Sequence, residues 1–376
     1  MIFTEWFYPG FRAGGPISSI VNMVDSISEA NFFIVTGNRD LNSKSPYEDI
    51  PTGKWIEYND HTKVMYLDDA SINNQSITGI LSQIPFDICY LNSLFSPYFT
   101  LVPLWYCSRK GHKERVILAP RGMLKPGALS VKSGKKKLFL KLVSMLKIFN
   151  RIGWHASSEI EAEEVRWHFG DLSNVYVVPN IARMQSEAFE PVKKESGELR
   201  LVTVARISPE KGMSEAVRFL DQPALENMRI HWTWIGPVGD TDYFDECLGR
   251  LKRMDHVHFD FKGECNPRQV PDMIREAHCF YLATRGENYG HAIAEALSMG
   301  KPVIISDRTP WRNLRNERAG YDLPLDDISF LEALLEMVEM GQVEYSKWST
   351  FSRSFVLRQV DNDNGIVGTK KMFGID

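Results

Sequence analysis

The sequence predicts an α/β protein built from two doubly wound parallel sheets that face each other across a central cleft. Short apolar, β-branched runs of strand length alternate with helical patterns along both halves of the chain. The 376 residues exceed one ordinary core and suit two domains of about 150 to 200 residues. A polar stretch at residues 186–198 reads as the linker. We therefore expect a first domain at 1–183, a second at 184–350 and a helical tail at 351–376.

The composition is that of an ordinary soluble globular protein, with 43% hydrophobic and 24% charged residues. A net charge of −4 gives no general attraction to nucleic acid. The five cysteines are scattered without a CxxC pair, which argues against a disulfide framework or zinc site and fits a reducing cytoplasm. No signal peptide precedes the first strand, and no apolar run reaches the ~18 residues of a membrane-spanning helix.

The first domain opens with a strand, a glycine loop, a helix and a strand, expected at residues 1–3, 7–16, 18–27 and 32–36. Gly14 and Gly15 in the loop would let the backbone approach a ligand closely, although an ordinary tight turn explains paired glycines as well. Further core strands are expected at 87–91 and 116–119. Arg121 follows the second of these and is either a cation for a phosphate or a surface arginine.

Residues 132–154 have an unusual composition, because lysine and arginine interleave with apolar residues and no acidic residue interrupts them. A helix here would have a basic side and a broad apolar side. Such a helix suits an anionic lipid surface. The alternative is a core helix with a solvated lysine face.

The second domain begins with a strand at 199–204, and its loop carries Arg206 and Lys211. Two fixed cations after a strand end would cradle a diphosphate and hold its charge as a sugar leaves. The alternative is a pair of solvated surface charges.

Residues 279–306 predict a βαβ unit. Strands are expected at 279–284 and 303–306, with a loop at 285–290 and a helix at 291–299 that stops at Gly300 before Pro302. Free backbone N–H groups of the first helical turn would face an anion at the carboxyl end of the strand.

Two carboxylates frame that turn, with Glu287 in the loop and Glu295 on the helix. Carboxylates accept hydrogen bonds from hydroxyls, so the pair suits a ligand that has sugar hydroxyls on both sides of a phosphate. That ligand is a nucleotide sugar. The simpler alternative is that Glu287 is a loop charge and Glu295 a solvated helix residue.

The run Glu-Asn-Tyr-Gly, then Glu-Ala-Leu, then Gly-Lys-Pro-Val-Ile resembles the signature of the family 4 retaining glycosyltransferases, which have the GT-B fold. The resemblance implies that Glu287 contacts hydroxyls of the donor sugar, that Glu295 binds the ribose, and that Arg206 and Lys211 clamp the diphosphate. It also implies donor contacts by Asn288, Tyr289, Gly290, His291, Gly15, Gly236 and Lys262. It implies as well that the first domain binds the acceptor, that the second binds the nucleotide sugar, and that the C-terminal tail packs back on the first domain. The chain departs from the family at Arg121, because many members have a histidine after that strand.

The resemblance implies a metal-independent hexosyltransferase that needs no cofactor and uses a UDP- or GDP-linked sugar as donor. The acceptor would be a glycan or polyprenyl-linked sugar in bacterial capsule or O-antigen synthesis, and the protein would be cytoplasmic or peripheral on the inner face of the plasma membrane. Two alternatives remain. One is a nucleotide-sugar epimerase of the same fold, and the other is a catalytically silent subunit that binds nucleotide sugar.

Overall fold

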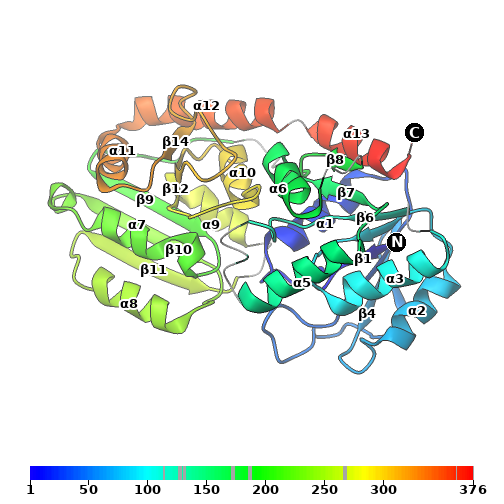
Figure 1. Cartoon of the computed structure of the whole chain (residues 1–376). Helices are drawn as coiled ribbons and strands as arrows, with labels where there is room; N and C mark the ends of the chain where they lie inside the picture. The colour runs from blue at the N-terminus through cyan, green and yellow to red at the C-terminus, as the bar shows by residue number, and fades with distance from the viewer. Residues whose placement is uncertain are drawn as a thin grey trace. The chain divides into compact units, whose positions relative to one another are not determined.

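The computed structural model describes residues 1–112, 115–125, 129, 133–170, 174–184, 189–265, 269–360 and 362–375. Lys132 and residues 186–188, which belong to two predicted segments, lie outside these ranges. The chain folds as two compact units (Figure 1). The first joins Met1–Ile181 to Asn362–Asp376, and the second is Ala182–Asp361. Each unit is an α/β layer structure and is described by itself.

The first unit contains a sheet of eight described strands in the order β3-β4-β2-β1-β5-β6-β7-β8. All neighbours are parallel except β3 and β4. The strands are β1 (Ile2–Phe3), β2 (Phe32–Gly37), β3 (Trp55–Asn59), β4 (Thr62–Leu67), β5 (Cys89–Leu91), β6 (Val116–Leu118), β7 (Gly153–Ala156) and β8 (Val175–Val177). The central strands are apolar throughout because helices cover both faces of the sheet.

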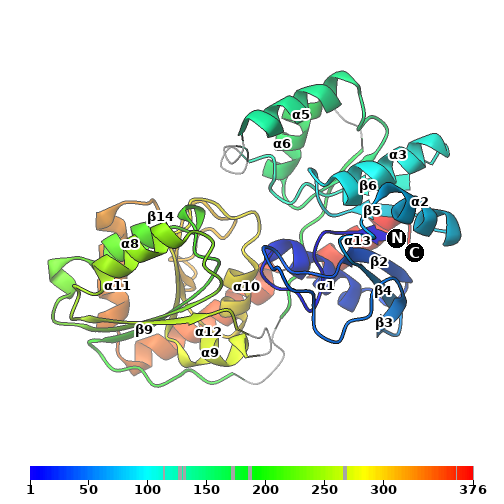
Figure 2. The ribbon, with the colours of Figure 1, turned by 90° about the horizontal axis from the view of Figure 1, so that it is seen from below.

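Helices on the two faces of the first sheet enclose two separate cores. The described helices are α1 (Gly15–Ser26), α2 (Asn74–Gln83), the π-helix η1 (Pro97–Leu101), α3 (Val102–Arg109), α5 (Ser133–Met145), α6 (Glu159–Phe169) and α13 (Asn362–Phe373). Side chains of α1 and α13 fill one core, whereas α2, α3, α5 and α6 contribute to the other. Figure 2 shows α2 and α3 side by side.

The second unit contains six described strands, all parallel, in the order β11-β10-β9-β12-β13-β14. The strands are β9 (Glu198–Val204), β10 (Arg229–Ile235), β11 (Val257–Gly263), β12 (Cys279–Leu282), β13 (Val303–Ser306) and β14 (Gly320–Leu323). Its helical segments are η3 (Pro209–Lys211), α7 (Met213–Leu220), η4 (Pro223–Leu225), α8 (Thr241–Leu251), α9 (Val270–Glu276), α10 (His291–Ser298), α11 (Asp327–Glu339) and α12 (Gln342–Gln359).

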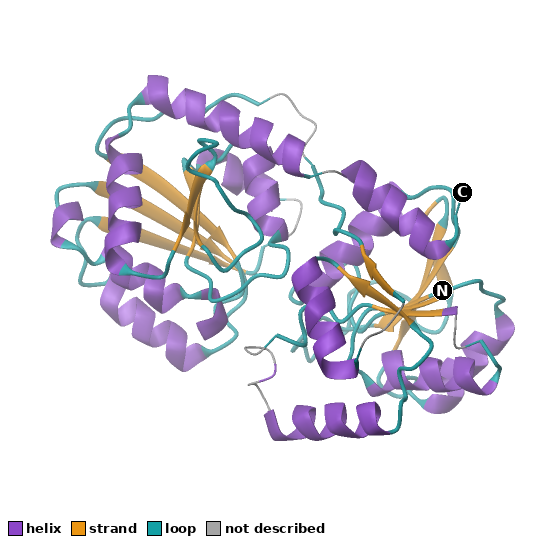
Figure 3. Ribbon diagram, turned by 45° about the horizontal axis from the view of Figure 1, so that its top comes forward, coloured by secondary structure: helices purple, strands orange, loops and turns teal. Residues whose placement is uncertain are grey.

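The second sheet is also covered on both faces (Figure 3). Residues of α7, α8 and α11 fill one core, and residues of α9, α10 and the end of α12 fill the other. The strand order reverses next to the first strand of each unit. β1 lies between β2 and β5, and β9 lies between β10 and β12. Open α/β sheets bind ligands at the carboxyl edge beside such a reversal.

Two boundaries differ from the sequence predictions. Helix α1 begins at Gly15 rather than Ser18, because Pro16 suits a first helical turn and the Gly14 carbonyl accepts from the amides of Ile17 and Ser18. The expected tail start at residue 351 falls inside α12, whose Phe355 is buried in the second unit. Helix α12 ends at Gln359, and α13 begins at Asn362.

Candidate functional site

The candidate site lies at the carboxyl edge of the second sheet, at the reversal between β9 and β12. β9 ends at Val204 and β12 ends at Leu282. The loop after β9 carries Arg206 and Lys211, and the loop after β12 carries Glu287. Because β9 and β12 are paired parallel neighbours, their two loops leave the same edge of the sheet side by side.

A glycine holds these two loops in contact. The Gly212 backbone has φ +70°, and a Cβ atom added there would lie 1.8 Å from the carbonyl oxygen of Ala283. The amide of Arg285 donates to the Glu210 carbonyl at 2.8 Å, and the Thr284 hydroxyl donates to the same oxygen at 3.2 Å. Only glycine fits this close approach with a left-handed backbone.

Lys211 and Glu287 form an ion pair across the loops. Lys211 Nζ donates to Glu287 Oε1 at 2.5 Å, and the side chains are 21% and 14% exposed. The amide of Glu287 also donates to the Arg308 carbonyl at 3.0 Å, which anchors the loop to the segment after β13. The predicted cation and the predicted sugar-binding carboxylate are therefore brought together, although 76 residues separate them.

Arg206 lies at the end of β9 as a half-buried side chain. Its guanidinium has no hydrogen bond or ion pair with any residue in the described ranges. Its Cδ lies 3.0 Å from the place that a Cβ on Gly239 would take, so the side chain runs along the turn after β10. A half-buried guanidinium without a protein partner suits an anionic ligand.

Gly236 shapes that turn after β10. It has φ +144°, and an added Cβ would lie 2.1 Å from the Ala205 carbonyl oxygen. The Gly236 amide donates to the Gly263 carbonyl at 2.7 Å, and the Ile207 amide donates to the Pro237 carbonyl at 2.8 Å. The predicted glycine thus joins the ends of three neighbouring strands beside Arg206.

Helix α10 begins directly after a left-handed glycine. Gly290 has φ 78°, and an added Cβ would lie 2.9 Å from Ile293 Cδ1 and 3.3 Å from Trp311 Nε1. The indole N–H of Trp311 donates to the Tyr289 carbonyl at 2.7 Å. No side chain among the described residues caps this helix start, so the dipole end is left for a ligand.

The rings of Tyr289 and His291 border the same helix start, with centroids 4.7 Å apart. Burial raises the pKa of the Tyr289 hydroxyl, so the phenol stays neutral at ordinary pH. Asn288 and Glu295 are half-buried, in the loop and on α10. Glu295 lies about 6 Å along the helix axis from His291, since a helix rises about 1.5 Å per residue.

The Lys262 side chain has an ion pair of its own. It lies on β11 at the sheet edge, where its Nζ pairs with Asp260 Oδ2 at 2.6 Å and both side chains are about 40% exposed. Residues two apart on a strand share one face, which explains the pair. The Lys262 side chain therefore does not join the Lys211 and Glu287 pair, whereas the neighbouring Gly263 carbonyl contacts Gly236.

Gly15 is the first residue of α1, after Gly14 with φ 63°. The loop before it is tethered by Asp40, whose Oδ2 accepts from the amides of Phe11 at 2.7 Å and Arg12 at 3.0 Å. Gly15 therefore lies in the first turn of α1, whereas the sequence pattern predicted it in the loop before the helix.

Arg121 is half-buried and hydrogen-bonded within the first unit. Its Nε donates to Asn92 Oδ1 at 2.7 Å, Nη1 donates to Asn180 Oδ1, and Nη2 donates to the Tyr90 hydroxyl at 2.7 Å. The Tyr90 hydroxyl lies 2.6 Å from His155 Nδ1. All three guanidinium nitrogens thus donate to uncharged groups of the first unit.

His155 completes this network as a neutral ring. Its Nε2 lies 2.9 Å from the Val178 carbonyl, which only accepts, so the proton is on Nε2 and Nδ1 accepts from Tyr90. Burial and the nearby Arg121 charge lower the pKa of His155 to about 3. Arg121, Tyr90 and His155 thus form one hydrogen-bonded network.

Ser208 is a site residue that sequence reasoning missed. Its Oγ is buried and has no hydrogen-bond partner among the described residues, and it lies between Arg206 and Lys211. A buried hydroxyl without a partner is unfavourable unless a ligand or water satisfies it. The position of Ser208 between Arg206 and Lys211 in the sequence could have indicated it as a site residue.

Residues 184–321 match the model of the family "Glycosyl transferases group 1". This stretch contains Arg206, Lys211, Glu287 and Glu295. A search of curated proteins found no significant match.

Solved structures match the whole chain. Anabaena HepE in complex with UDP and glucose has a TM-score of 0.67 at 12% identity, covering 98% of both chains. An α,α-trehalose-phosphate synthase (UDP-forming) from Burkholderia xenovorans in complex with glucose-6-phosphate has 0.68 at 12%, also covering 98% of both. WaaG, a glycosyltransferase involved in lipopolysaccharide biosynthesis, has 0.64 at 12%, covering 99% of this chain and 98% of its own. At this identity the likeness shows the fold, so the predicted two-domain GT-B fold is confirmed.

Proposed function

We propose that the protein moves a sugar from a nucleotide-diphosphate sugar to a glycan or lipid-linked acceptor, which the match of residues 184–321 to the model of the group 1 glycosyl transferases supports. The observation that carries this proposal is the Lys211–Glu287 ion pair at the strand-order reversal of the second sheet, with Arg206 on the same loop as Lys211. Two cations and one carboxylate match a ligand that joins a diphosphate to a hydroxylated ring.

Donor binding in this scheme rearranges the ion pair. The diphosphate accepts from Arg206 and competes for Lys211 with Glu287, to which Lys211 Nζ donates in the structure. The released Glu287 then accepts hydrogen bonds from hydroxyls of the donor sugar. Charge–charge contacts inside a half-buried site are stronger than in water, so this exchange favours an ionic ligand over water.

We propose further that the reaction retains the anomeric configuration and needs no metal ion or cofactor. Arg206 and Lys211 supply the positive charge that stabilises the departing nucleoside diphosphate. The leaving phosphate itself assists attack of the acceptor on the same face of the sugar. Proton NMR of the product tests this, because the anomeric coupling constant reports whether the configuration of the donor is kept.

For donor identity, we propose a UDP- or GDP-linked hexose. Thermal-shift screening against UDP-, GDP- and ADP-sugars tests this, since a ligand that binds the native state raises the melting temperature. Replacing both cations by Arg206→Ala and Lys211→Ala together should abolish the shift and lower kcat by about 10²-fold or more. Near-normal turnover of the double variant would refute the diphosphate clamp.

We also propose that the protein works on surface polysaccharides, such as capsule or O-antigen, at the inner face of a bacterial membrane through α5. Three apolar side chains of α5 and one just after it are exposed, namely Leu138 (60%), Leu142 (43%), Met145 (67%) and Leu146 (62%). Lys141 and Lys147 are exposed beside them. Among the described residues, no helix has the length and apolarity needed to cross a bilayer.

Vesicle sedimentation tests this contact. The protein should bind vesicles that contain phosphatidylglycerol and leave phosphatidylcholine vesicles unbound, because anionic lipids attract lysine. Leu142→Ser with Met145→Ser should abolish binding. Val343→Ser, at a residue 75% exposed on α12, is the matched control and should leave binding unchanged. Equal binding by the α5 variant would contradict the proposal.

A further inference from the structure

Strand β11 forms an open edge of the second sheet in the described part of the chain. It pairs with β10 alone and stands first in the strand order of its sheet (Figure 1). The strand is 7 residues long, which is long for an edge strand left open. An open edge presents unpaired backbone N–H and C=O groups, so it is a template for pairing with another strand.

The backbone groups of alternate β11 residues point away from β10. The Ile230 amide of β10 donates to the carbonyl of His256, just before β11, at 3.0 Å. Bonding groups of a ladder recur at every second residue, so the even-numbered residues of β11 face β10. The amides and carbonyls of Phe259 and Phe261 therefore point outward. Within the described residues, no backbone hydrogen bond from a loop or helix reaches these two phenylalanines.

The side chains of β11 separate an apolar face from a charged face. Phe259 and Phe261 pack against the core of the second unit, and the centroid of the Phe261 ring lies 4.7 Å from that of Phe244 on α8. Asp260 and Lys262 lie on the other face, with side chains 41% and 42% exposed. The open edge therefore carries one negative and one positive charge, two residues apart on the same face.

These two charges are complementary to those of a second β11 that runs in the opposite direction. A two-fold axis through the edge would pair the strand antiparallel with itself. With Phe261 on the axis, each Asp260 lies opposite the partner's Lys262, so two opposite-charge pairs form. An axis through Asp260 or through Lys262 would instead place two like charges opposite each other. The outward backbone groups of Phe261 also meet their own copies in the first register, as an antiparallel hydrogen-bonded pair requires.

We propose that this chain forms a two-fold symmetric dimer in which β11 of one copy pairs antiparallel with β11 of a second copy. Asp260 and Lys262 fix the register, and the pairing covers the outer sides of the half-buried Phe259 and Phe261. A short paired strand is a small interface, so the dimer is weak and dissociates at micromolar concentration. This contact goes beyond the proposed function and does not depend on it, since the donor site lies on the loops after β9 and β12.

Analytical ultracentrifugation of the full chain tests this pairing. The natural protein should pass from monomer to dimer between chain concentrations of about 1 and 200 µM. Asp260→Lys and Lys262→Asp should each weaken dimerisation by about tenfold or more, because each variant places like charges opposite each other twice. An equimolar mixture of the two variants should dimerise again, since a chain with two lysines then meets a chain with two aspartates.

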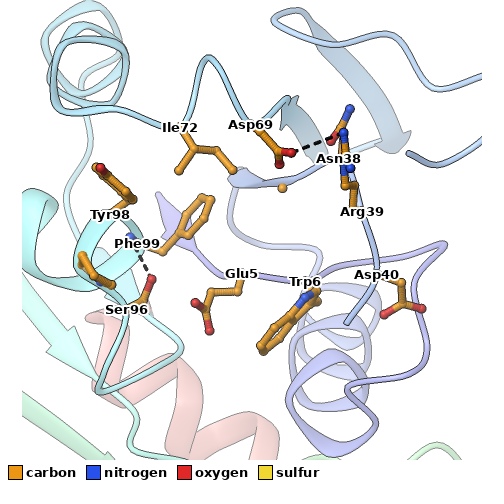
Figure 4. A pocket seen from close by; sticks show the side chains of 12 residues that line it. Glu5, Trp6, Asn38, Arg39, Asp40, Asp69, Ile72, Ser96, Tyr98 and Phe99 are labelled. Carbon is orange, nitrogen blue, oxygen red and sulfur yellow. Dashed lines mark hydrogen bonds and ion pairs between the residues drawn. The ribbon is translucent and has the colours of Figure 1, made fainter. Parts of the chain in front are cut away.

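Two more variants separate loss of the edge pairing from other effects. Asp260→Lys combined with Lys262→Asp should dimerise by itself, because both pairs are reversed together. The matched control is Asp69→Lys in the first unit, where Asp69 is an exposed carboxylate whose Oδ2 lies 3.3 Å from Arg39 Nη2 (Figure 4). This control makes the same charge reversal at an ion pair outside β11 and should dimerise as the natural protein does.

Three results would overturn the proposal. The first is a natural protein that stays monomeric at the highest concentration. The second is a dimer that either single variant at Asp260 or Lys262 forms as tightly as the natural protein, or that the Asp69→Lys control loses. The third is a mixture of the two single variants that stays monomeric, because only the register with Phe261 on the axis predicts its recovery.

Discussion

Replacing Lys211 by methionine separates its structural role from its proposed role at the phosphate. The change removes the positive charge and keeps the length of the side chain. It leaves Glu287, whose side chain is 14% exposed, without the partner now 2.5 Å from it. Two effects follow, one on stability and one on turnover, and they respond differently to a second substitution.

The expected loss of stability lies between two limits. Exposed ion pairs contribute about 0–1 kcal/mol, and breaking a buried pair costs about 3–5 kcal/mol. With Lys211 21% and Glu287 14% exposed, we expect about 2 kcal/mol for Lys211→Met. This corresponds to a Tm decrease of about 4–8 °C for a unit of this size. Adding Glu287→Gln should restore most of it, because the buried charge is gone.

Turnover, unlike stability, should not recover with the second substitution. Loss of one cation at the leaving phosphate should lower kcat by about 10²–10³, comparable to removing one donor that stabilises developing charge. The second substitution, Glu287→Gln, should not restore kcat. Lys262→Met is the matched control, since that lysine has an ion pair of 2.6 Å but is 42% exposed, and it should change stability by less than about 1 kcal/mol.

The assays are chemical denaturation for stability and nucleoside diphosphate release for turnover. Recovery of kcat in the Lys211→Met, Glu287→Gln double variant would show that Lys211 acts only by neutralising Glu287. Such a result would refute the direct phosphate contact while leaving the ion pair intact as a structural feature.

Two further predictions concern the loops and the buried histidines. Gly212→Ala should lower the free energy of unfolding by more than about 2 kcal/mol and weaken nucleotide binding, because the new Cβ would overlap the Ala283 carbonyl at 1.8 Å. The control Gly197→Ala, with φ +83° and nothing within 4 Å of the new Cβ, should lower it by about 1 kcal/mol. Equal urea midpoints of the two variants would contradict this. Burial lowers the pKa of His155 and of His278 to about 3, below the ordinary 6.5. The contribution of these neutral histidines to the free energy of unfolding should therefore be fully present above pH 6.5. It should fall by about 1.4 kcal/mol per pH unit for each histidine as the pH drops toward 3. Urea midpoints that stay constant from pH 7 to 5 would contradict this.

Local sequence patterns predicted the βαβ unit around Glu287 closely. The strand expected at 279–284 is β12, the helix expected at 291–299 is α10, and Gly300 ends it with φ 68°. These elements depend on periodicity and on residues that start or stop a helix, which neighbouring positions determine. The cap of α6 is equally local, since the Ser158 side chain accepts from the Glu161 amide.

Side-chain partners were harder to predict, because they depend on tertiary contacts. The acceptors of Arg121 lie 29 to 59 residues away, so a lone arginine after a strand gave no sign of its network. The ion pair of Lys262 with Asp260 could have been predicted from the sequence, since alternate residues of a strand share a face. The roles of Arg206, Glu287 and Glu295 toward a donor stay predictions.

A crystal structure with the nucleoside diphosphate that gives the largest thermal shift tests the central claim most directly. The account predicts that its phosphate oxygens lie within hydrogen-bond distance of the Arg206 guanidinium and the Lys211 ammonium, with the Lys211–Glu287 contact lengthened from 2.5 Å. A nucleotide bound to other residues, with that ion pair unchanged, would contradict it.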